Sequence, residues 1–323
     1  MSAAAVLGPV GRALTAARSR ILMYHRFGEP GQSLRMDRLT FERQVLLLKR
    51  NFRLRRLSDV VGRLASGQPL EPRTAVITVD DGYADFIEYA VPVLERHDVP
   101  ATVYLVSRFV SQEIWLWFDA VHWLASHAPA GSYTVTLSGC ARPVALRSPE
   151  ERHRLWLEVA DECVKLGPDA QSAVLERLQA ELNLVLPAKP TAEYAAMTWE
   201  QARQLDPQLI EVGAHTCNHV LLSRCSPDLQ RDEIAGSKRD IEARLGRAVE
   251  AFCYPNGMPE DYTDTTVALV REAGFRSAVL AHGGMSSAGS DRFRLERLGA
   301  PCDPRLFRNC VNGLWHLRDA LSR

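Results

Sequence analysis

Regularly spaced cysteines are missing from this sequence. Its seven cysteines are scattered, and no two of them stand in a C-x-x-C spacing. An odd number without regular spacing argues against the disulfide framework of a secreted protein. We therefore expect reduced thiols and a cytoplasmic protein.

An excess of charge of either sign is also missing. Lysine plus arginine total 39, and aspartate plus glutamate total 39. Nucleic-acid-binding domains usually carry a basic surface, so we expect no nucleic-acid partner.

Long hydrophobic runs are absent from the N-terminal region. Its apolar stretch, Ala3–Val10, is interrupted by Gly8 and Pro9 and is too short for a secretory signal core or a transmembrane segment. Arginines within residues 1–19 would allow weak contact with a membrane surface, so a peripheral position on the inner face of the membrane is the alternative location. We expect 1–19 to be a flexible N-terminal tail and 20–323 to be the folded domain.

Short runs rich in valine, isoleucine, tyrosine and threonine alternate with longer segments of helical period. We predict strands at Arg20–His25, Thr74–Val79, Ala101–Val106, Leu209–Gly213, Ala251–Tyr254, Arg276–Ala281 and Arg294–Gly299. We predict helices at Thr40–Asn51, Ser58–Ser66, Asp85–His97, Pro227–Leu245, Asp261–Ala273 and Asp303–Leu317. Such alternation is typical of an α/β fold with a parallel sheet, open or closed into a barrel.

The segment at about 112–197 interrupts this alternation. Apolar residues at helical spacing start it, a polar, turn-rich stretch follows at 128–148, and two further helices are predicted at 149–166 and 169–184. We expect a mostly helical insertion beside the barrel. Its tryptophans Trp115, Trp117 and Trp123 are either core residues or platforms for a sugar ring.

Two adjacent aspartates, Asp80 and Asp81, follow the predicted strand Thr74–Val79. Adjacent carboxylates at the end of a buried strand raise each other's pKa unless a cation lies between them. In parallel α/β folds, this end of the strand is also where active sites form. The alternative is a simple turn, in which Asp81-Gly82 caps the next helix.

Two histidines, His215 and His219, stand four residues apart just after another predicted strand. Imidazole nitrogens and a carboxylate are ordinary zinc ligands, and two histidines with one carboxylate leave coordination positions open for water and substrate. Together with Asp81 they predict a site for one divalent metal ion. Zinc is the first expectation, and cobalt, nickel and iron also suit these ligands.

Two further strand ends carry polar residues. His25 follows the first predicted strand, and either a hydrogen-bonded histidine or a catalytic one is compatible with that position. The segment Phe252–Gly257 is a strand running into a Pro-Asn-Gly turn. It is either only a turn, or a loop that presents a backbone N–H and the ring of Tyr254 to a substrate.

These residues resemble the motifs of the polysaccharide deacetylases of carbohydrate esterase family four, the nodulation-type deacetylases. Thr78–Gly82 matches the T-F-D-D-G motif with valine in place of phenylalanine, and His215–His219 matches H-[ST]-x-x-H in full. Phe252–Gly257 is similar to the third motif. The early Tyr24-His25 resembles the branch with circularly permuted motif order, which includes deacetylases of poly-N-acetylglucosamine.

The resemblance implies a distorted (β/α) barrel of about seven strands and a role for each residue. Asp81, His215 and His219 would hold the metal, Asp80 would act as the general base, and His25 would act as the general acid. His282 is the rival of His25 for that role.

The sequence departs from the family's third motif at two positions, since Asn256 stands where many members have an aromatic residue and Cys253 also differs. Cys253 stands where many members have the arginine that orients the base, and Arg26 and Arg297 are the candidates to supply the missing charge. Tyr254, Asn256 and Arg297 are expected to line the substrate site.

The implied activity is metal-dependent hydrolysis of the N-acetyl amide of an amino sugar, in a polysaccharide or a glycan intermediate. The expected partner is thus an N-acetylated saccharide. One alternative is an amidase or deformylase acting on another amide. The other is a non-catalytic carbohydrate-binding module on the same fold.

Overall fold

All seven predicted strands contribute to one parallel sheet in the computed structural model, which describes residues 3–32 and 34–315. The order along the sheet is β11-β10-β9-β6-β5-β1-β12, and the short β4 pairs with the start of β5. The strands of this sheet are β1 Arg20–Tyr24, β4 Arg53–Leu54, β5 Thr74–Val79, β6 Ala101–Leu105, β9 Ile210–Ala214, β10 Ala251–Cys253, β11 Ser277–Val279 and β12 Leu298–Gly299.

The last segment of the sheet joins its two edges. On one side, Leu298 pairs with Leu22 of β1, and on the other side Leu295 forms a parallel bridge with Val279 of β11. The predicted distorted barrel of about seven strands is therefore confirmed.

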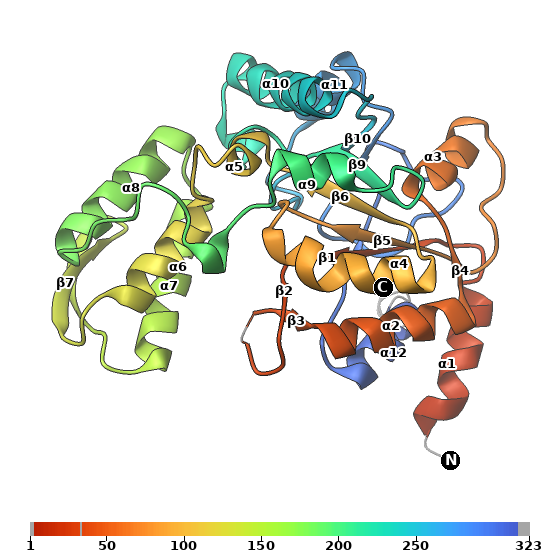
Figure 1. Cartoon of the computed structure of the whole chain (residues 1–323), viewed down its shortest axis with the longest axis horizontal. Helices are drawn as coiled ribbons and strands as arrows, with labels where there is room; N and C mark the ends of the chain where they lie inside the picture. Colours follow the sequence, from red (N-terminus) through yellow and green to blue (C-terminus); the bar gives the residue numbers. More distant parts are fainter. Residues whose placement is uncertain (1–2, 33, 316–323) are drawn as a thin grey trace.

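Burial on both faces explains why the central strands read as continuous apolar runs. Every residue of β5 and of β6 is buried, because one face lines the barrel interior and the other lies under helices. Figure 1 shows the helices arranged around the sheet. Those of the barrel are α2 Arg38–Asn51, α3 Leu57–Ala65, α4 Val91–His97, α5 Ser107–Val110, α9 Trp199–Gln204, α10 Pro227–Leu245, α11 Asp264–Glu272 and α12 Pro304–Val311.

Local sequence signals fix several helix ends. Ser226 accepts a hydrogen bond from the N–H of Leu229 at the start of α10, and Gly246, with φ 66°, ends that helix in the left-handed conformation. The predicted helix Asp85–His97 is present as a π-helical turn at Phe86–Ala90 followed by α4. The predicted end of the last helix, Leu317, lies outside the described residues.

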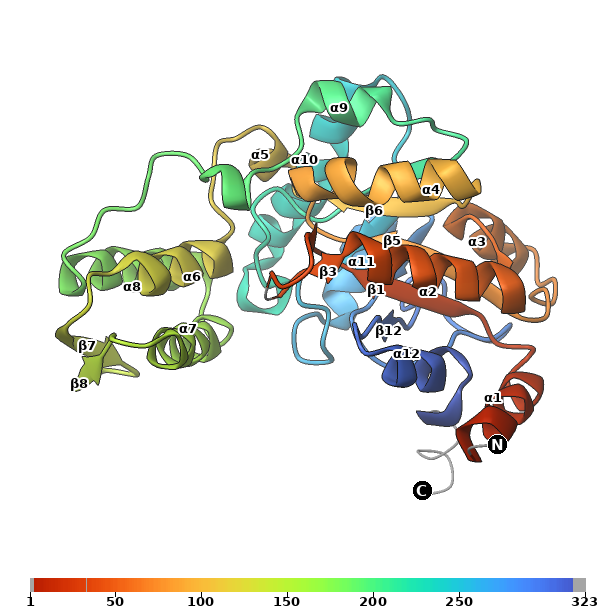
Figure 2. The same cartoon turned by 60° about the horizontal axis from the view of Figure 1, so that its bottom comes forward.

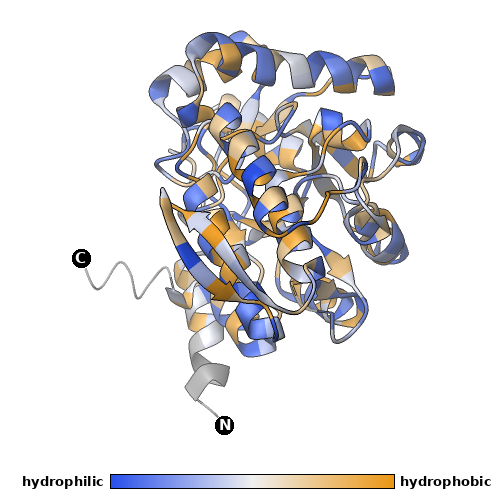
Figure 3. Cartoon of the chain, turned by 90° about the vertical axis from the view of Figure 1, so that its left-hand side faces the viewer, coloured by the Kyte–Doolittle hydropathy of each residue, from blue (hydrophilic) through white to orange (hydrophobic). Residues whose placement is uncertain are grey.

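The insertion forms a separate layer at one side of the barrel (Figures 1 and 2). It contains α6 Trp117–His127, β7 Ser132–Leu137, β8 Cys140–Ala145, α7 Pro149–Cys163 and α8 Pro168–Glu181. Its helices alternate hydrophobic and hydrophilic stretches, as Figure 3 shows from the insertion side, and they enclose a core of their own that includes Leu124, Leu155 and Leu178. The polar stretch 128–148, predicted as turn-rich, instead contains the antiparallel hairpin β7-β8.

The segment predicted as a flexible tail contains helix α1, Ala3–Leu14. Arg12 Nη1 donates a hydrogen bond to Asn312 Oδ1 at 2.8 Å, and buried Arg20 donates to the carbonyl oxygen of Thr15. These contacts attach the segment to β1 and to the residues after α12, and the flexibility expected for 1–19 stays a prediction. Within the described part of the chain, no helix is long and apolar enough to cross a membrane.

Two short strands, β2 Phe27–Gly28 and β3 Met36–Asp37, pair with each other after β1. They shape the loop that carries Leu34 and Arg35 to the same end of the barrel as His25, where both side chains line a cavity.

Candidate metal centre and active site

The carboxyl ends of the parallel strands meet at one end of the barrel and surround a cavity of about 580 Å³. Its lining contains every residue that the sequence singled out as a site residue, namely His25, Asp80, Asp81, His215, His219, Tyr254, Asn256 and Arg297. Residues more than 200 positions apart meet here because parallel strands all open on the same edge.

The chain turns sharply where β5 ends. Asp81 has φ 75° and Gly82 has φ 88°, both in the left-handed region. At Gly82, a Cβ atom would come 2.8 Å from the side chain of Leu105, so only glycine fits. The non-glycine Asp81 is strained there, which is a frequent property of functional positions.

Asp81, His215 and His219 bring three ligand atoms together. Asp81 Oδ1 lies 3.5 Å from the Nε2 atoms of both histidines. Tetrahedral ligands about 2.1 Å from a zinc ion stand about 3.4 Å from one another, so these separations match those around a bound ion. The three side chains are buried, and Asp81 Oδ1 has no hydrogen-bond partner among the described residues. A buried carboxylate oxygen without a partner is costly, and a cation would remove that cost.

The histidine tautomer also suits a metal. The Nδ1 atom of His215 lies 2.8 Å from the carbonyl oxygen of Cys253, so Nδ1 carries the proton and the lone pair of Nε2 is free. Burial lowers the pKa of His215 to about 4, which keeps the ring neutral at pH 7.

A second group of close donor atoms, Asp80, His215 and Cys253, shares one histidine with the first. There, however, both oxygens of Asp80 already accept hydrogen bonds from Arg297. The donor set left free is therefore Asp81, His215 and His219.

A buried glutamate of α10 holds the loop between the two histidines. Glu233 Oε2 accepts hydrogen bonds from the N–H groups of Cys217 and Asn218, each at 2.9 Å. Thr216 and His219 have φ values of 65° and 55°, so this loop is strained and needs such an anchor. Glu233 was not identified from the sequence, since it lies on a helix and belongs to no motif.

Asp80 forms a bidentate ion pair with Arg297 inside the barrel. The Nη1 and Nη2 atoms of Arg297 each lie 2.7 Å from an oxygen of Asp80, and the arginine side chain is 0% exposed. Burial alone would raise the pKa of Asp80, but the Arg297 guanidinium holds that pKa well below its usual range. Asp80 is therefore an ionised carboxylate of fixed orientation.

The small side chain of Cys253 leaves room for this guanidinium. Its Sγ lies 3.2 Å from Arg297 Nη2 and 3.6 Å from Asp80 Oδ2. Of the two arginines that could replace the one expected at position 253, Arg297 is thus the one that contacts Asp80. Arg26 instead donates from Nε to Asp85 Oδ2 at 2.7 Å.

Of the two histidines considered for the general acid, His25 lies beside Asp80 and lines the cavity, whereas His282 does not line it. The Nε2 atom of His25 is 3.7 Å from Asp80 Oδ2, and the side chain is 47% exposed and lines the cavity. His282 is half-buried, and its carbonyl oxygen accepts a hydrogen bond from the N–H of Arg297.

The three side chains predicted to bind substrate already form hydrogen bonds with other protein groups. The hydroxyl of Tyr254 donates to the carbonyl of Phe293, and Asn256 Nδ2 donates to Asp261 Oδ2. Arg297 holds Asp80. Of the two roles expected for Arg297, the geometry therefore favours orienting the base over contacting substrate.

The insertion supplies polar residues that were not identified from the sequence. Asp119 of α6 is buried, accepts a hydrogen bond from the hydroxyl of Tyr83 at 2.6 Å, and lies 4.0 Å from Arg26 Nη1. Burial raises the pKa of Asp119 to about 7. No motif signals Asp119, because its role depends on how the insertion packs on the barrel.

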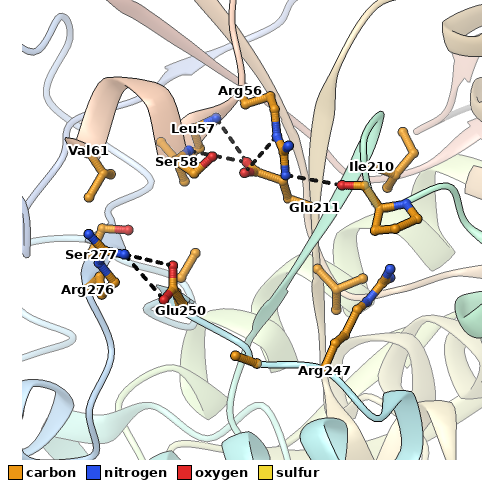
Figure 4. A pocket seen from close by; sticks show the side chains of 14 residues that line it. Arg56, Leu57, Ser58, Val61, Ile210, Glu211, Arg247, Glu250, Arg276 and Ser277 are labelled. Atoms are coloured by element: carbon orange, nitrogen blue, oxygen red, sulfur yellow. Dashed lines mark hydrogen bonds and ion pairs between the residues drawn. The ribbon is translucent and has the colours of Figure 1, made fainter. Parts of the chain in front are cut away.

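A second cavity, of about 370 Å³, lies at the opposite end of the barrel (Figure 4). Its half-buried carboxylate, Glu211, accepts hydrogen bonds from the N–H groups of Leu57 and Ser58 at the start of α3 and pairs with Arg56 Nε at 3.2 Å. Glu211 is fully used in joining α3 to β9, so this cavity shows no comparable set of free donor atoms among the described residues.

Comparison with known proteins agrees with this geometry. The polysaccharide deacetylase family profile matches residues 67–154 and 169–278, more than half of the chain. The chain belongs to the polysaccharide deacetylase family. The Bacillus subtilis protein named "Putative polysaccharide deacetylase YxkH" is 20% identical over 284 residues, which are 87% of this chain and 71% of that protein.

Solved structures of similar fold include further deacetylases. The Streptococcus pyogenes deacetylase PplD, in complex with acetate, has 18% identity and a TM-score of 0.59, over 94% of this chain and 98% of that one. IcaB from Ammonifex degensii has 16% identity and a TM-score of 0.58, over 92% and 97%. The deacetylase domain of BpsB from Bordetella bronchiseptica has 16% identity and a TM-score of 0.54, over 88% and 96%. At these identities the likeness concerns the fold.

Proposed function

We propose that this protein removes the acetyl group from the nitrogen of an N-acetylated amino sugar by hydrolysis. The observation that carries the proposal is the buried, unpartnered Oδ1 of Asp81 between two imidazole nitrogens at 3.5 Å, at the base of a substrate-sized cavity. Membership of the polysaccharide deacetylase family supports the choice of bond and of substrate class.

One divalent metal ion, zinc in the first place, would be held by Asp81, His215 and His219. When bound, such an ion supplies Lewis acidity for the acetyl carbonyl and for the attacking water. Cobalt, nickel and iron suit the same donor set.

The side chains of the barrel would handle the protons. Asp80, ionised and oriented by Arg297, accepts the proton of the attacking water. His25, whose Nε2 atom lies 3.7 Å from Asp80 Oδ2, donates a proton to the departing sugar nitrogen. The backbone N–H of Asn256, at the rim of the cavity, is the proposed donor to the developing oxyanion.

Acetate release tests the proposal. Purified protein, stripped of metal and supplied with Zn²⁺, Co²⁺ or Ni²⁺, is incubated with N-acetylglucosamine glycosides and N-acetylated oligosaccharides. We expect acetate in the presence of metal, and little metal binding or acetate from His215→Ala.

The matched control is His97→Ala, since His97 pairs with Glu42 and neither residue lines the cavity. It should bind metal and release acetate like the unmodified protein. Absence of acetate with every metal and every saccharide, or unchanged metal content in His215→Ala, would refute the proposal.

A further inference from the structure

The cavity at the metal centre has one largely apolar stretch of wall. The barrel contributes the charged and polar groups of the metal centre. The insertion contributes four polar side chains, Asp119, His122, Glu193 and Tyr194, and also five apolar ones that we call the apolar wall, Trp117, Phe118, Trp156, Ala160 and Val164.

The apolar wall begins at the metal centre itself. The ring of Phe118 packs edge-on against that of His219, with centroids 5.2 Å apart. A group that projects from the reacting amide toward Phe118 therefore meets hydrocarbon.

Large apolar side chains continue this surface to the mouth of the cavity. Leu34 is 59% exposed and Met258 is 39% exposed, and both line the cavity from loops of the barrel. Exposed apolar residues that adjoin a pocket are typical of a binding site for an apolar group.

A second sugar ring would fit the aliphatic part of this wall poorly. Sugar hydroxyls placed against Ala160 or Val164 would lose hydrogen bonds to water without gaining others, and each unpaired hydroxyl is costly. Aliphatic carbon placed there would instead gain free energy by leaving water.

The charges of the cavity indicate how the apolar group is joined to the sugar. Three arginines occur among the described lining residues, and each already faces a carboxylate. Arg26 and Arg35 lie 2.7 and 3.6 Å from Asp85 Oδ2, and Arg297 is paired with Asp80. A phosphate in the linkage would find no uncommitted guanidinium, so an uncharged linkage is favoured.

We infer that the substrate is an N-acetylated amino sugar joined by an uncharged glycosidic linkage to a lipid-like group that lies on the apolar wall. This inference rests on the proposed deacetylase function and specifies its substrate class.

A series of glycosides tests the inference. Acetate release is measured with the methyl, butyl and octyl glycosides of N-acetylglucosamine, below their micelle concentrations, and with N,N′-diacetylchitobiose. We expect kcat/KM to rise from methyl to octyl, by up to about fourfold for each CH₂ that the wall buries. The octyl glycoside should also exceed the disaccharide.

Two variants on one helix test the location. Ala160→Asp places a charge on the apolar wall and should lower the octyl-to-methyl ratio of kcat/KM at least tenfold. Leu157→Asp changes a residue of the same helix that is 48% exposed and does not line the cavity, so it should preserve the ratio.

The outcomes separate this inference from the proposed function. Acetate release without dependence on chain length, a preference for the disaccharide, or a ratio that Ala160→Asp leaves unchanged would overturn the inference alone. No acetate from any of the four compounds would overturn the deacetylase function and the inference with it.

Discussion

The pair of Asp80 and Arg297 gives the sharpest test of how the site is held together. Both side chains are at most 3% exposed, and two hydrogen bonds of 2.7 Å join them. Replacing Arg297 by methionine leaves the carboxylate buried without a counter-ion. Breaking a buried pair in this way costs about 3–5 kcal/mol of the free energy of unfolding.

A surface pair provides the scale for comparison. Arg231 contacts Asp228 at 2.9 Å, but their side chains are 54% and 94% exposed. Arg231→Met should therefore change the free energy of unfolding by less than about 1 kcal/mol. Urea denaturation of the metal-free proteins at pH 7 measures both changes.

The double variant Arg297→Met with Asp80→Asn keeps the test valid if the single variant folds poorly. A neutral amide needs no counter-ion, so the double variant should be more stable than Arg297→Met alone. Equal effects of Arg297→Met and Arg231→Met, or a double variant less stable than Arg297→Met, would refute an ion pair that stabilises the ionised Asp80.

Three further predictions concern other parts of the site and the fold. His25→Ala should abolish most acetate release from N-acetyl sugars but largely spare the hydrolysis of an activated aryl acetate, because that leaving group needs no acid. His282→Ala should affect neither reaction. An exchange of these behaviours between the two variants would refute the assignment of His25. The pKa of Asp119, raised by burial to about 7, exceeds the usual value of about 3.9, so the folded state retains an extra proton between these pH values and stability falls as the pH rises through that window. Asp119→Asn should flatten the pH dependence of the free energy of unfolding between pH 5 and 7, and an unchanged slope would contradict the prediction. Glu211→Gln removes the carboxylate that binds the start of α3 and should lower the free energy of unfolding, measured by urea denaturation, by about 1–3 kcal/mol. Glu250→Gln changes a side chain that is 50% exposed and should lower it by less than about 1 kcal/mol. Equal losses would argue against the anchoring role of Glu211.

The barrel and the donor atoms at its carboxyl end were predictable from sequence for one physical reason. Strands buried on both faces read as unbroken apolar runs, and polar residues directly after such runs must share one edge of a parallel sheet. Asp81 and His215 meet on that basis despite their separation along the chain. The partner of Asp80 was harder to predict. Both Arg26 and Arg297 lie in or directly after predicted strands, and only the packing shows that Arg26 pairs with Asp85 instead.

The hairpin of the insertion was missed because only one of its two strands has an alternating sequence. Most residues of β7 and all of β8 are at least partly exposed, and Val135 is the one buried position of β7. In β7, Tyr133, Val135 and Leu137 alternate with polar residues and pack on the core of the insertion, but β8 has no such alternation. Helix α1 was missed for a different reason. It is held by contacts such as that of Arg12 with Asn312, which lies 300 positions away in the sequence.

The insertion also decides which tryptophans can meet a substrate. Helical spacing placed Trp117 on the apolar stripe of its helix. The sequence therefore favoured a core residue at least as much as a platform for a sugar ring. In the structure, Trp123 is buried in the core of the insertion, the indole N–H of Trp115 donates to the carbonyl of Pro187, and Trp117 lines the cavity with Trp156. An amphipathic helix at the junction of two cores has two apolar faces, and its sequence does not tell which one closes on the neighbouring barrel.

Neighbouring residues of α6 carry two different kinds of contact to the barrel. Phe118 contacts the ring of His219, while the next residue, Asp119, reaches Tyr83 and Arg26. A single turn of the insertion thus supplies both hydrocarbon and a carboxyl group beside residues of the barrel. Changes in this turn can alter the lining of the cavity without replacing any of the three residues of the proposed metal site. In the proposed enzyme, the residues that select the substrate and those that perform the chemistry therefore come from different segments of the chain.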